Sequence, residues 1–282
     1  MTDKIKNMLV RTVTGVLFVA ALVTSFLRFE AMVFLFAIIT GLTLWEYATI
    51  VNTMKAVRIN RFISTAAGVY FFLAVAGYCS GITPSAVFIP YLLTVVYLFV
   101  SELYTRHEHA INDWAYTMLS QMYIALPFAM LNVLAFQSSD DGIRYCRILP
   151  LSIFIFLWTS DTGAYCVGSL LGRHKLFPRI SPAKSWEGSL GGAILVLIAA
   201  SLISQLIDDA SILTLYEWLG LGLVVTIFGT WGDLVESLFK RTVGIKDSGN
   251  ILPGHGGMLD RFDSALMAIP AAVVYLYTLT LI

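Results

Sequence analysis

The residues best suited to chemistry in this chain lie between positions 233 and 263. This stretch holds five of the eighteen acidic residues, namely Asp233, Glu236, Asp247, Asp260 and Asp263. It also holds basic side chains and a histidine flanked by glycines, namely Lys240, Arg241, Lys246, Arg261 and His255. Charged groups are costly near hydrocarbon, so this many of them in so apolar a chain indicates a functional role.

The carboxylates of this stretch are spaced to share helix faces. If one helix continues past residue 240, Asp233, Glu236 and Lys240 lie at i, i+3 and i+7, on a single face. Asp260 and Asp263 are again three residues apart. Carboxylates from two helices that converge across a glycine-rich turn are suited to a divalent cation. All-oxygen ligation favours Mg²⁺ over Zn²⁺, and neighbouring Lys and Arg residues favour phosphates.

Two further segments carry charge. Asp161 lies in an apolar run, within SDTGAY, and is therefore a candidate functional acid; a helix-packing hydrogen bond is the alternative. The basic segment 172–187 contains Lys184 and Glu187. Its Ser181-Pro182 pair predicts a helix start, with Ser at the cap and Pro in the first turn. A basic loop that leads into a helix N-terminus favours anions, and anchoring to lipid headgroups is the alternative.

These residues leave three classes of function open. Metal-assisted phosphoryl or nucleotidyl transfer is favoured by the mixture of carboxylates and basic groups. An ion-coupled transporter and a lipid-binding scaffold are the alternatives. A transporter would place acids at mid-membrane depth in broken helices, whereas only Asp161 is expected to lie deep here. The chain has no GxxxxGK[ST] segment, so a P-loop is excluded.

Composition determines the setting of these residues. The chain is 58% hydrophobic and 13% charged, which excludes an ordinary soluble domain. Apolar runs of about twenty residues, the length that spans ~30 Å of hydrocarbon, recur along it. We therefore predict an all-α polytopic integral membrane protein with about nine transmembrane helices. They are expected near residues 8–27, 30–51, 62–80, 84–101, 112–136, 148–171, 188–207, 212–232 and 264–282.

The distribution of basic residues predicts the orientation of these spans. Most Lys and Arg residues fall on one side, and Arg28, Arg144 and Arg147 fall on the other. By the positive-inside rule, the N-terminus is cytoplasmic, and the charged loops at 172–187 and 233–263 face the cytosol.

We predict two regions with different roles. Residues 1–147 are expected to supply packing and oligomer contacts, and residues 148–282 the catalytic region. In the first region, Glu46 lies within or near the end of a span. We expect a structural or interfacial role for it, with lining of a polar cavity as the alternative.

Residues 237–263, SLFKRTVGIKDSGNILPGHGGMLDRFD, resemble the signature of the phosphatidate cytidylyltransferases, also called CDP-diacylglycerol synthases. That pattern runs Ser, two variable residues, Lys-Arg, a short gap, Lys-Asp, a small residue, His-Gly-Gly, a hydrophobic position and Asp-Arg-x-Asp. The upstream segments SDTGAY and SPAKSWEG are also similar to the family's. The resemblance is strong over residues 155–270, and the first half is similar only as generic membrane spans.

The resemblance implies an enzyme that condenses CTP with phosphatidic acid, giving CDP-diacylglycerol and pyrophosphate for phospholipid biosynthesis. Similar proteins use Mg²⁺, with K⁺ as the second ion of a paired metal centre, in a polar cavity open to the cytosolic side. Because the lipid tails would stay in the bilayer, we expect this cavity to open sideways to lipid as well. We further expect a homodimer, no nucleic-acid partner, and a location in the inner cell membrane if the chain is bacterial.

The resemblance also implies roles for individual residues. The expected metal ligands are Asp233 and Asp260, with Glu236 and Asp263 as further candidates. The catalytic candidates, expected at the phosphates or orienting the groups that bind them, are Lys240, Arg241, Lys246, Asp247, His255 and Arg261. The residues expected to bind substrate are Asp161, Lys184, Glu187, Ser237, Gly256 and Gly257. A membrane lipid-alcohol kinase that uses CTP is the alternative within the superfamily, and it would transfer the γ-phosphoryl group instead.

Overall fold

The computed structural model describes residues 3–105, 107–139, 142–249, 251 and 256–280. The chain divides into two compact units. Unit 1 comprises Met1–Arg147 and Val243–Phe262, and unit 2 comprises Ile148–Thr242 and Asp263–Ile282. The signature segment 237–263 is therefore shared between the two units.

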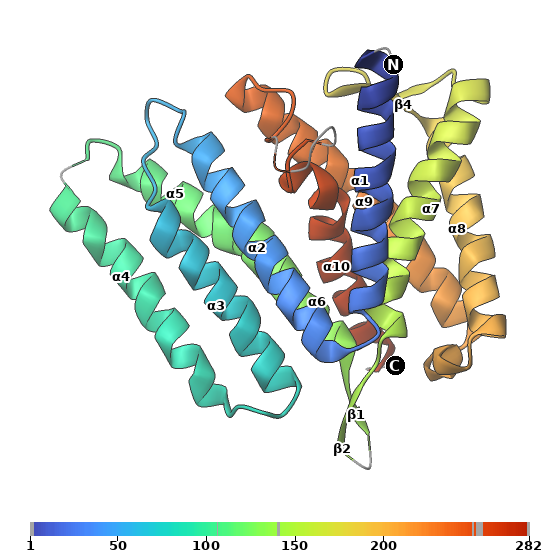
Figure 1. Cartoon of the computed structure of the whole chain (residues 1–282), viewed down its shortest axis with the longest axis horizontal. Coiled ribbons are helices and arrows are strands. Elements are labelled where there is room, and N and C mark those ends of the chain that lie inside the picture. The colour runs from blue at the N-terminus through green and yellow to red at the C-terminus, as the bar shows by residue number, and fades with distance from the viewer. Residues whose placement is uncertain (1–2, 106, 140–141, 250, 252–255, 281–282) are drawn as a thin grey trace. The chain divides into compact units, whose positions relative to one another are not determined.

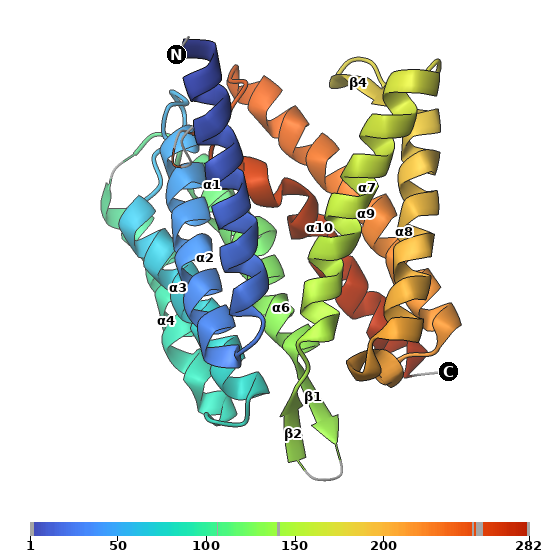
Figure 2. The ribbon, with the colours of Figure 1, turned by 45° about the vertical axis from the view of Figure 1, so that its right-hand side comes forward.

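Unit 1 is a group of helices with one short β-hairpin. Its elements are α1 (Asp3–Ser25), α2 (Phe29–Val51), α3 (Arg61–Cys79), η1 (Ser85–Phe88), α4 (Ile89–Thr105), α5 (Ala110–Ser120), the π-helical turn η2 (Gln121–Ala125), α6 (Leu126–Ala135), β1 (Phe136–Ser139) and β2 (Gly142–Tyr145). Helices α2, α3 and α4 run side by side, with α3 in contact with both neighbours (Figure 1). The strands pair antiparallel, from Phe136 opposite Tyr145 to Ser139 opposite Gly142. Figure 2 shows this hairpin projecting beyond the end of α6.

Aromatic side chains in the core of unit 1 pack against the first turn of the last helix, α10 (Leu259–Leu279). The ring of Phe262, in the first turn of α10, lies 5.4 Å from that of Phe128 and 6.1 Å from that of Phe36. All three rings are fully or almost fully buried. Edge-to-face packing of this kind adds to the free energy of apolar burial. The start of α10 is therefore fixed in the core of unit 1.

Unit 2 contains the elements that carry most of the predicted site residues. These are α7 (Ile148–Leu171), β3 (Lys175–Phe177), β4 (Ser181–Ser185), α8 (Trp186–Leu206), η3 (Asp208–Ile212), α9 (Leu215–Val243) and the part of α10 from Asp263 onward. Figures 1 and 2 both show α7 and α8 side by side. Glycines allow this approach: a Cβ on Gly192 would lie 2.7 Å from the carbonyl oxygen of Ser160. Small residues at such interfaces let helix backbones pack closely in lipid.

The ends of two helices test expectations drawn from the sequence. Helix α9 continues to Val243, so the condition under which Asp233, Glu236 and Lys240 share a helix is met. It ends before Gly244, whose φ of 80° suits a helix C-terminus. The helix start predicted at Ser181-Pro182 is wrong. Residues 181–185 form strand β4, in which Ser181 pairs with Phe177, and α8 begins at Trp186. Its cap is Ser185, whose hydroxyl oxygen accepts a hydrogen bond from the Gly188 N–H.

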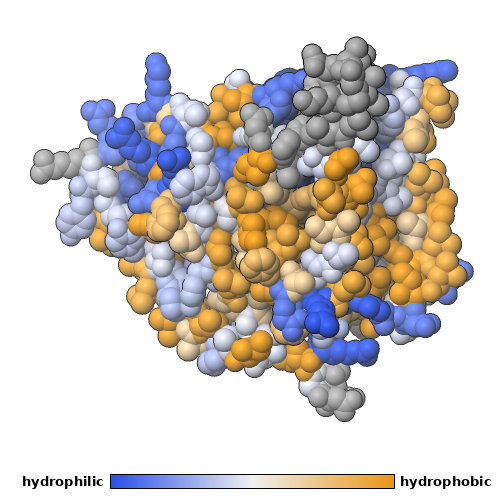
Figure 3. Space-filling model, viewed as in Figure 1, coloured by the Kyte–Doolittle hydropathy of each residue, from blue (hydrophilic) through white to orange (hydrophobic). Residues whose placement is uncertain are grey.

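Eight helices among the described residues are long and apolar enough to cross a membrane. They correspond to the predicted spans from 30–51 to 264–282. Within α1, the apolar helical stretch Thr12–Ser25 is shorter, so the total of about nine spans stays a prediction. Figure 3 shows broad apolar surfaces on the helices, with hydrophilic residues gathered toward helix ends. The protein is therefore a helical membrane protein with several spans.

The contact between α7 and α8 yields a test of packing. We expect Gly192→Ala to lower the stability of the purified protein by roughly 1–3 kcal/mol, because the new methyl group would press on backbone that has little room to move. Gly41→Ala is the matched control, since its Cβ would meet only side-chain methyl groups. Thermal unfolding in detergent measures both. Equal transition temperatures for the two variants would contradict this account of the α7–α8 interface.

Candidate active site

An ion pair joins two of the predicted site residues in unit 2. The Lys184 Nζ lies 2.5 Å from the Asp233 Oδ2. The Ser237 hydroxyl, one helical turn further along α9, donates a hydrogen bond of 3.2 Å to the other oxygen of Asp233. Both charged side chains are partly exposed, with 25% of Lys184 and 31% of Asp233 accessible. The pair is therefore ordered and also reachable by a ligand.

Local structure explains how these residues meet. Lys184 lies on β4, and the β3–β4 hairpin holds this strand directly before α8. Asp233 follows Gly232, where α9 approaches α10: a Cβ on Gly232 would lie 2.6 Å from the carbonyl oxygen of Asp263. A larger residue at position 232 would separate the two helices. Gly232 is thus a site-forming residue that was not predicted from the sequence. Its position directly before Asp233 could have indicated a close approach of helices at the site.

Two more acids share the electrostatic field of this pair. Asp161 on α7 and Asp263 on α10 both interact with Lys184 and Asp233. Three carboxyl groups therefore face one lysine, and repulsion between them opposes ionisation of all three. A bound cation would relieve this repulsion. We call Asp161, Lys184, Asp233 and Asp263 the acidic cluster.

The acidic cluster fits a hard metal ion by its donor chemistry. Among the described residues, no three His, Cys, Asp or Glu side chains form a ready-made metal cage. Mg²⁺ usually keeps several waters and is held by one or two carboxylates together with substrate phosphates. The cluster offers oxygen donors of that kind, so the residues present are compatible with Mg²⁺.

Two candidates assigned to different roles pair with each other on α9. The Lys240 Nζ lies 2.7 Å from the Glu236 Oε2, one helical turn away, and the Glu236 side chain is fully buried. Burial of this carboxylate requires a partner of opposite charge. Lys240 therefore compensates the charge of the buried Glu236 near the end of α9. The proposed roles of Glu236 at the metal and Lys240 at a phosphate stay predictions.

Glu187 organises the basic segment at the start of the hairpin. Its carboxylate accepts hydrogen bonds of 3.2 Å from the backbone N–H groups of Arg173 and His174, and lies 2.5 Å from the His174 Nδ1. These contacts tie the first turn of α8 to the segment after α7. Glu187 therefore shapes the loop that presents Lys184, and direct contact with substrate stays a prediction for it.

The predicted residues of unit 1 form a second network around Asp260. Its Oδ2 accepts hydrogen bonds from the backbone N–H groups of Ser248, at 2.9 Å, and Gly257, at 3.0 Å. Gly256 adopts a φ of 85°, a conformation that glycine takes readily. Asp260 thus closes the loop that precedes α10.

Four further candidates of the signature are exposed among the described residues. Exposed side chains that were expected to act at the phosphates are Arg241, Lys246, Asp247 and Arg261. His255 lies outside the described residues. Asp233 belongs to unit 2 and Asp260 to unit 1. Their convergence on one metal ion stays a prediction.

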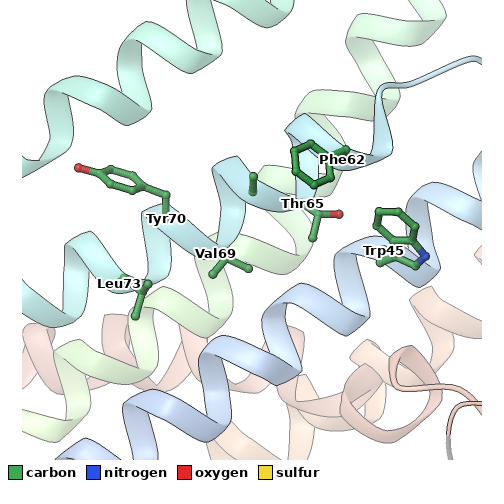
Figure 4. A pocket seen from close by; sticks show the side chains of 7 residues that line it. Trp45, Phe62, Thr65, Val69, Tyr70 and Leu73 are labelled. Atoms are coloured by element: carbon green, nitrogen blue, oxygen red, sulfur yellow. The ribbon is translucent and has the colours of Figure 1, made fainter.

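An apolar groove in unit 1 is distinct in character from these polar groups. It has a volume of about 410 Å³ and lies along α2 and α3 (Figure 4). Its lining residues are Trp45, Phe62, Thr65, Ala66, Val69, Tyr70 and Leu73. An apolar groove of this kind offers little to a phosphate. The polar cavity expected on the cytosolic side stays a prediction.

The acidic cluster makes a stability prediction. We expect Lys184→Ala to lower the stability by roughly 1–2 kcal/mol, because it leaves Asp233 beside two other carboxylates without their shared lysine; partial exposure of the pair limits the effect. The double variant Lys184→Ala/Asp233→Asn should recover most of this loss. Lys175→Ala, at an exposed lysine of the same hairpin, is the control. Thermal unfolding decides, and no recovery in the double variant would contradict the proposed balance of charge.

Comparison with known proteins places the chain in a family. The profile described as the cytidylyltransferase family matches residues 8–279. The chain is 34% identical over 264 residues to a protein named phosphatidate cytidylyltransferase of Staphylococcus epidermidis, covering 93% of this chain and 96% of that one. Proteins of the same name from Staphylococcus aureus and Staphylococcus haemolyticus are 32% and 33% identical, with the same coverage. The chain therefore belongs to the cytidylyltransferase family.

Proposed function

We propose that this enzyme transfers the cytidylyl group of CTP to phosphatidic acid, giving CDP-diacylglycerol and pyrophosphate. The observation that carries the proposal is similarity along almost the whole chain to proteins named for this activity. The similarity includes both units, so it covers the acidic cluster and the loop before α10 alike.

The chemistry of the transfer is consistent with the side chains present. A phosphate oxygen of phosphatidic acid attacks the α-phosphorus of CTP, and the bond from that phosphorus to the oxygen bridging to the β-phosphate breaks as pyrophosphate leaves. The attacking phosphate is already an anion, so the reaction needs no strong base. Its difficulty is the repulsion between two polyanions, which cations reduce.

Basic side chains are the residues that would reduce this repulsion. We assign Lys184 to a phosphate of one reactant, since its ammonium group is ordered by Asp233 and partly accessible. The exposed Lys246, Arg241 and Arg261 are assigned to the remaining phosphate oxygens. These assignments place basic side chains where negative charge gathers during the transfer.

We propose Mg²⁺ as the metal, with K⁺ as a candidate second ion. Asp233 and Asp263 of the acidic cluster would hold it, with Asp260 contributing from the start of α10. A bound Mg²⁺ ion would supply positive charge that reduces the repulsion between the two reacting phosphates. The oxygen donors of the cluster, and the repulsion between its carboxyl groups that a cation would relieve, support this choice.

The membrane setting suits a substrate with two acyl chains. We propose an integral protein of the cell membrane, with a cytoplasmic N-terminus and charged loops on the cytosolic side, where CTP is found. A homodimer is the proposed assembly. The lipid tails would remain in the bilayer while the phosphate reaches the acidic cluster.

Position-specific labels in CTP test the proposed transfer. Purified protein should incorporate label from [α-³²P]CTP into lipid in the presence of phosphatidic acid and Mg²⁺, and should release label from [γ-³²P]CTP as pyrophosphate. The physical reason is that attack at the α-phosphorus keeps that atom with the lipid. Label from the γ-position in the lipid would identify a lipid kinase instead, and all label remaining water-soluble would contradict the proposal.

A matched pair of substitutions tests the acidic cluster in the same assay. We expect Asp233→Asn to lower turnover by about 10²–10³-fold, because it removes a negative charge that orders Lys184 and supports the metal. Asp208→Asn, at an exposed acid in η3, should stay within about twofold. Turnover is compared for protein of equal thermal stability. Equal activity of the two variants would overturn the assignment of Asp233.

A further inference from the structure

A buried acid far from the signature in sequence contacts the loop that the signature forms. Glu46 lies near the end of α2, and its side chain is buried within unit 1. Its carboxylate accepts hydrogen bonds from the Ser248 hydroxyl and from two backbone N–H groups, those of Met258 at 2.9 Å and Leu259 at 3.1 Å. All three donors belong to the segment that leads into α10.

The contacts of Glu46 match the needs of a helix N-terminus. The first N–H groups of a helix lack hydrogen-bond partners within the helix. The positive end of the helix dipole lies at these groups. The Glu46 carboxylate supplies both acceptors and negative charge at the start of α10. A side chain from α2 therefore caps a helix that begins 213 residues later.

Two glycines of the signature make room for this carboxylate. A Cβ on Gly257 would overlap both Glu46 and the Ser248 hydroxyl. A Cβ on Gly249 would lie 2.7 Å from the Glu46 Oε2. The family resemblance implies that Gly257 binds substrate. The structure gives it a further reason to be glycine, which is contact with Glu46.

The network passes from Glu46 to the candidate catalytic residues. Ser248 donates its hydroxyl hydrogen to Glu46, accepts a hydrogen bond from the Asp260 N–H at 3.3 Å, and donates its own N–H to the Asp260 Oδ2. Ser248 also follows directly after Lys246 and Asp247. Glu46 thus fixes the residue that orients Asp260 and the basic segment before it.

We infer that Glu46 is a positioning residue for the transfer reaction, holding Ser248 against the start of α10 so that Asp260 and Lys246 are correctly placed. The inference rests on the proposed function for the reaction that it serves. Glu46 itself touches neither substrate nor metal in this scheme. Its effect passes through Ser248 and the first turn of α10.

The isosteric variant Glu46→Gln tests this role. A carboxylate accepts hydrogen bonds through both oxygens, whereas a carboxamide has one acceptor oxygen and one NH₂ donor. In the variant, the NH₂ group would face another hydrogen-bond donor, so the network cannot form unchanged. We expect kcat to fall by about 100-fold, with KM for CTP changed less than about threefold, because misplacement of reacting groups affects turnover more than binding. Glu30→Gln, at the exposed acid in the first turn of α2, is the matched control and should keep wild-type kcat.

Hydrogen exchange separates positioning from a general effect on folding. In Glu46→Gln, the backbone amides of Met258 and Leu259 should exchange about tenfold faster, as expected for loss of a hydrogen bond, while amides of α3 keep their wild-type rates. Wild-type kcat together with wild-type exchange would overturn the inference. So would a loss of activity that follows the loss of folded protein, with unchanged kcat per folded molecule.

A second variant keeps the test open if Glu46→Gln does not fold. Ser248→Ala removes only the hydroxyl that joins Glu46 to Asp260, and it should also lower kcat at least about tenfold. In the double variant, the two losses should be far from additive, because both changes break one network. Wild-type kcat for Ser248→Ala, or full additivity, would overturn the inference. Wild-type protein that produces no labelled lipid would instead refute the proposed function, and the exchange measurement would still test the Glu46 contact.

Discussion

A carboxylate among membrane helices costs free energy unless other groups compensate its charge, and this constraint explains the partners of three acids in this chain. Asp233 pairs with Lys184, Glu236 pairs with Lys240, and Glu46 accepts hydrogen bonds from the start of α10. These carboxylates differ in how accessible they remain to a ligand. Glu236 is fully buried with its lysine, whereas Asp233 stays partly exposed beside Asp161 and Asp263. The acidic cluster combines accessibility with three neighbouring carboxyl groups, and a bound metal ion would relieve the repulsion between them.

Close contact between backbones gives these charges their positions. Gly232 lets α9 approach α10 beside Asp233, and Gly192 lets α8 approach α7, which carries Asp161. In unit 1, Gly257 admits the Glu46 carboxylate to the start of α10. Each glycine lies between a different pair of elements. At each of these positions, a side chain would force the two elements further apart. The site thus depends on residues that carry no functional group of their own.

Much of this organisation could be predicted from local sequence patterns. The apolar runs indicated membrane helices, which is confirmed. Helix α9 extends far enough to carry Asp233, Glu236 and Lys240, the condition on which their shared face depended. Local sequence patterns failed where contacts between distant segments determine the structure. Ser181-Pro182 looks like a helix start, but pairing with β3 keeps these residues extended. Glu46 and Ser248 are 202 residues apart, so no local pattern links them. The pairing of Lys184 with Asp233 likewise depends on how unit 2 folds.

The central claim is that carboxylates of the acidic cluster hold a cation that lets two phosphates react, and the position of that cation tests it most directly. Crystals of the protein grown with Mn²⁺ and a non-hydrolysable CTP analogue would locate the metal by its anomalous scattering. The account predicts a peak ~2.1 Å from an oxygen of Asp233 or Asp263 and also in contact with the phosphates of the analogue. A metal bound to the phosphates away from both carboxylates would contradict it.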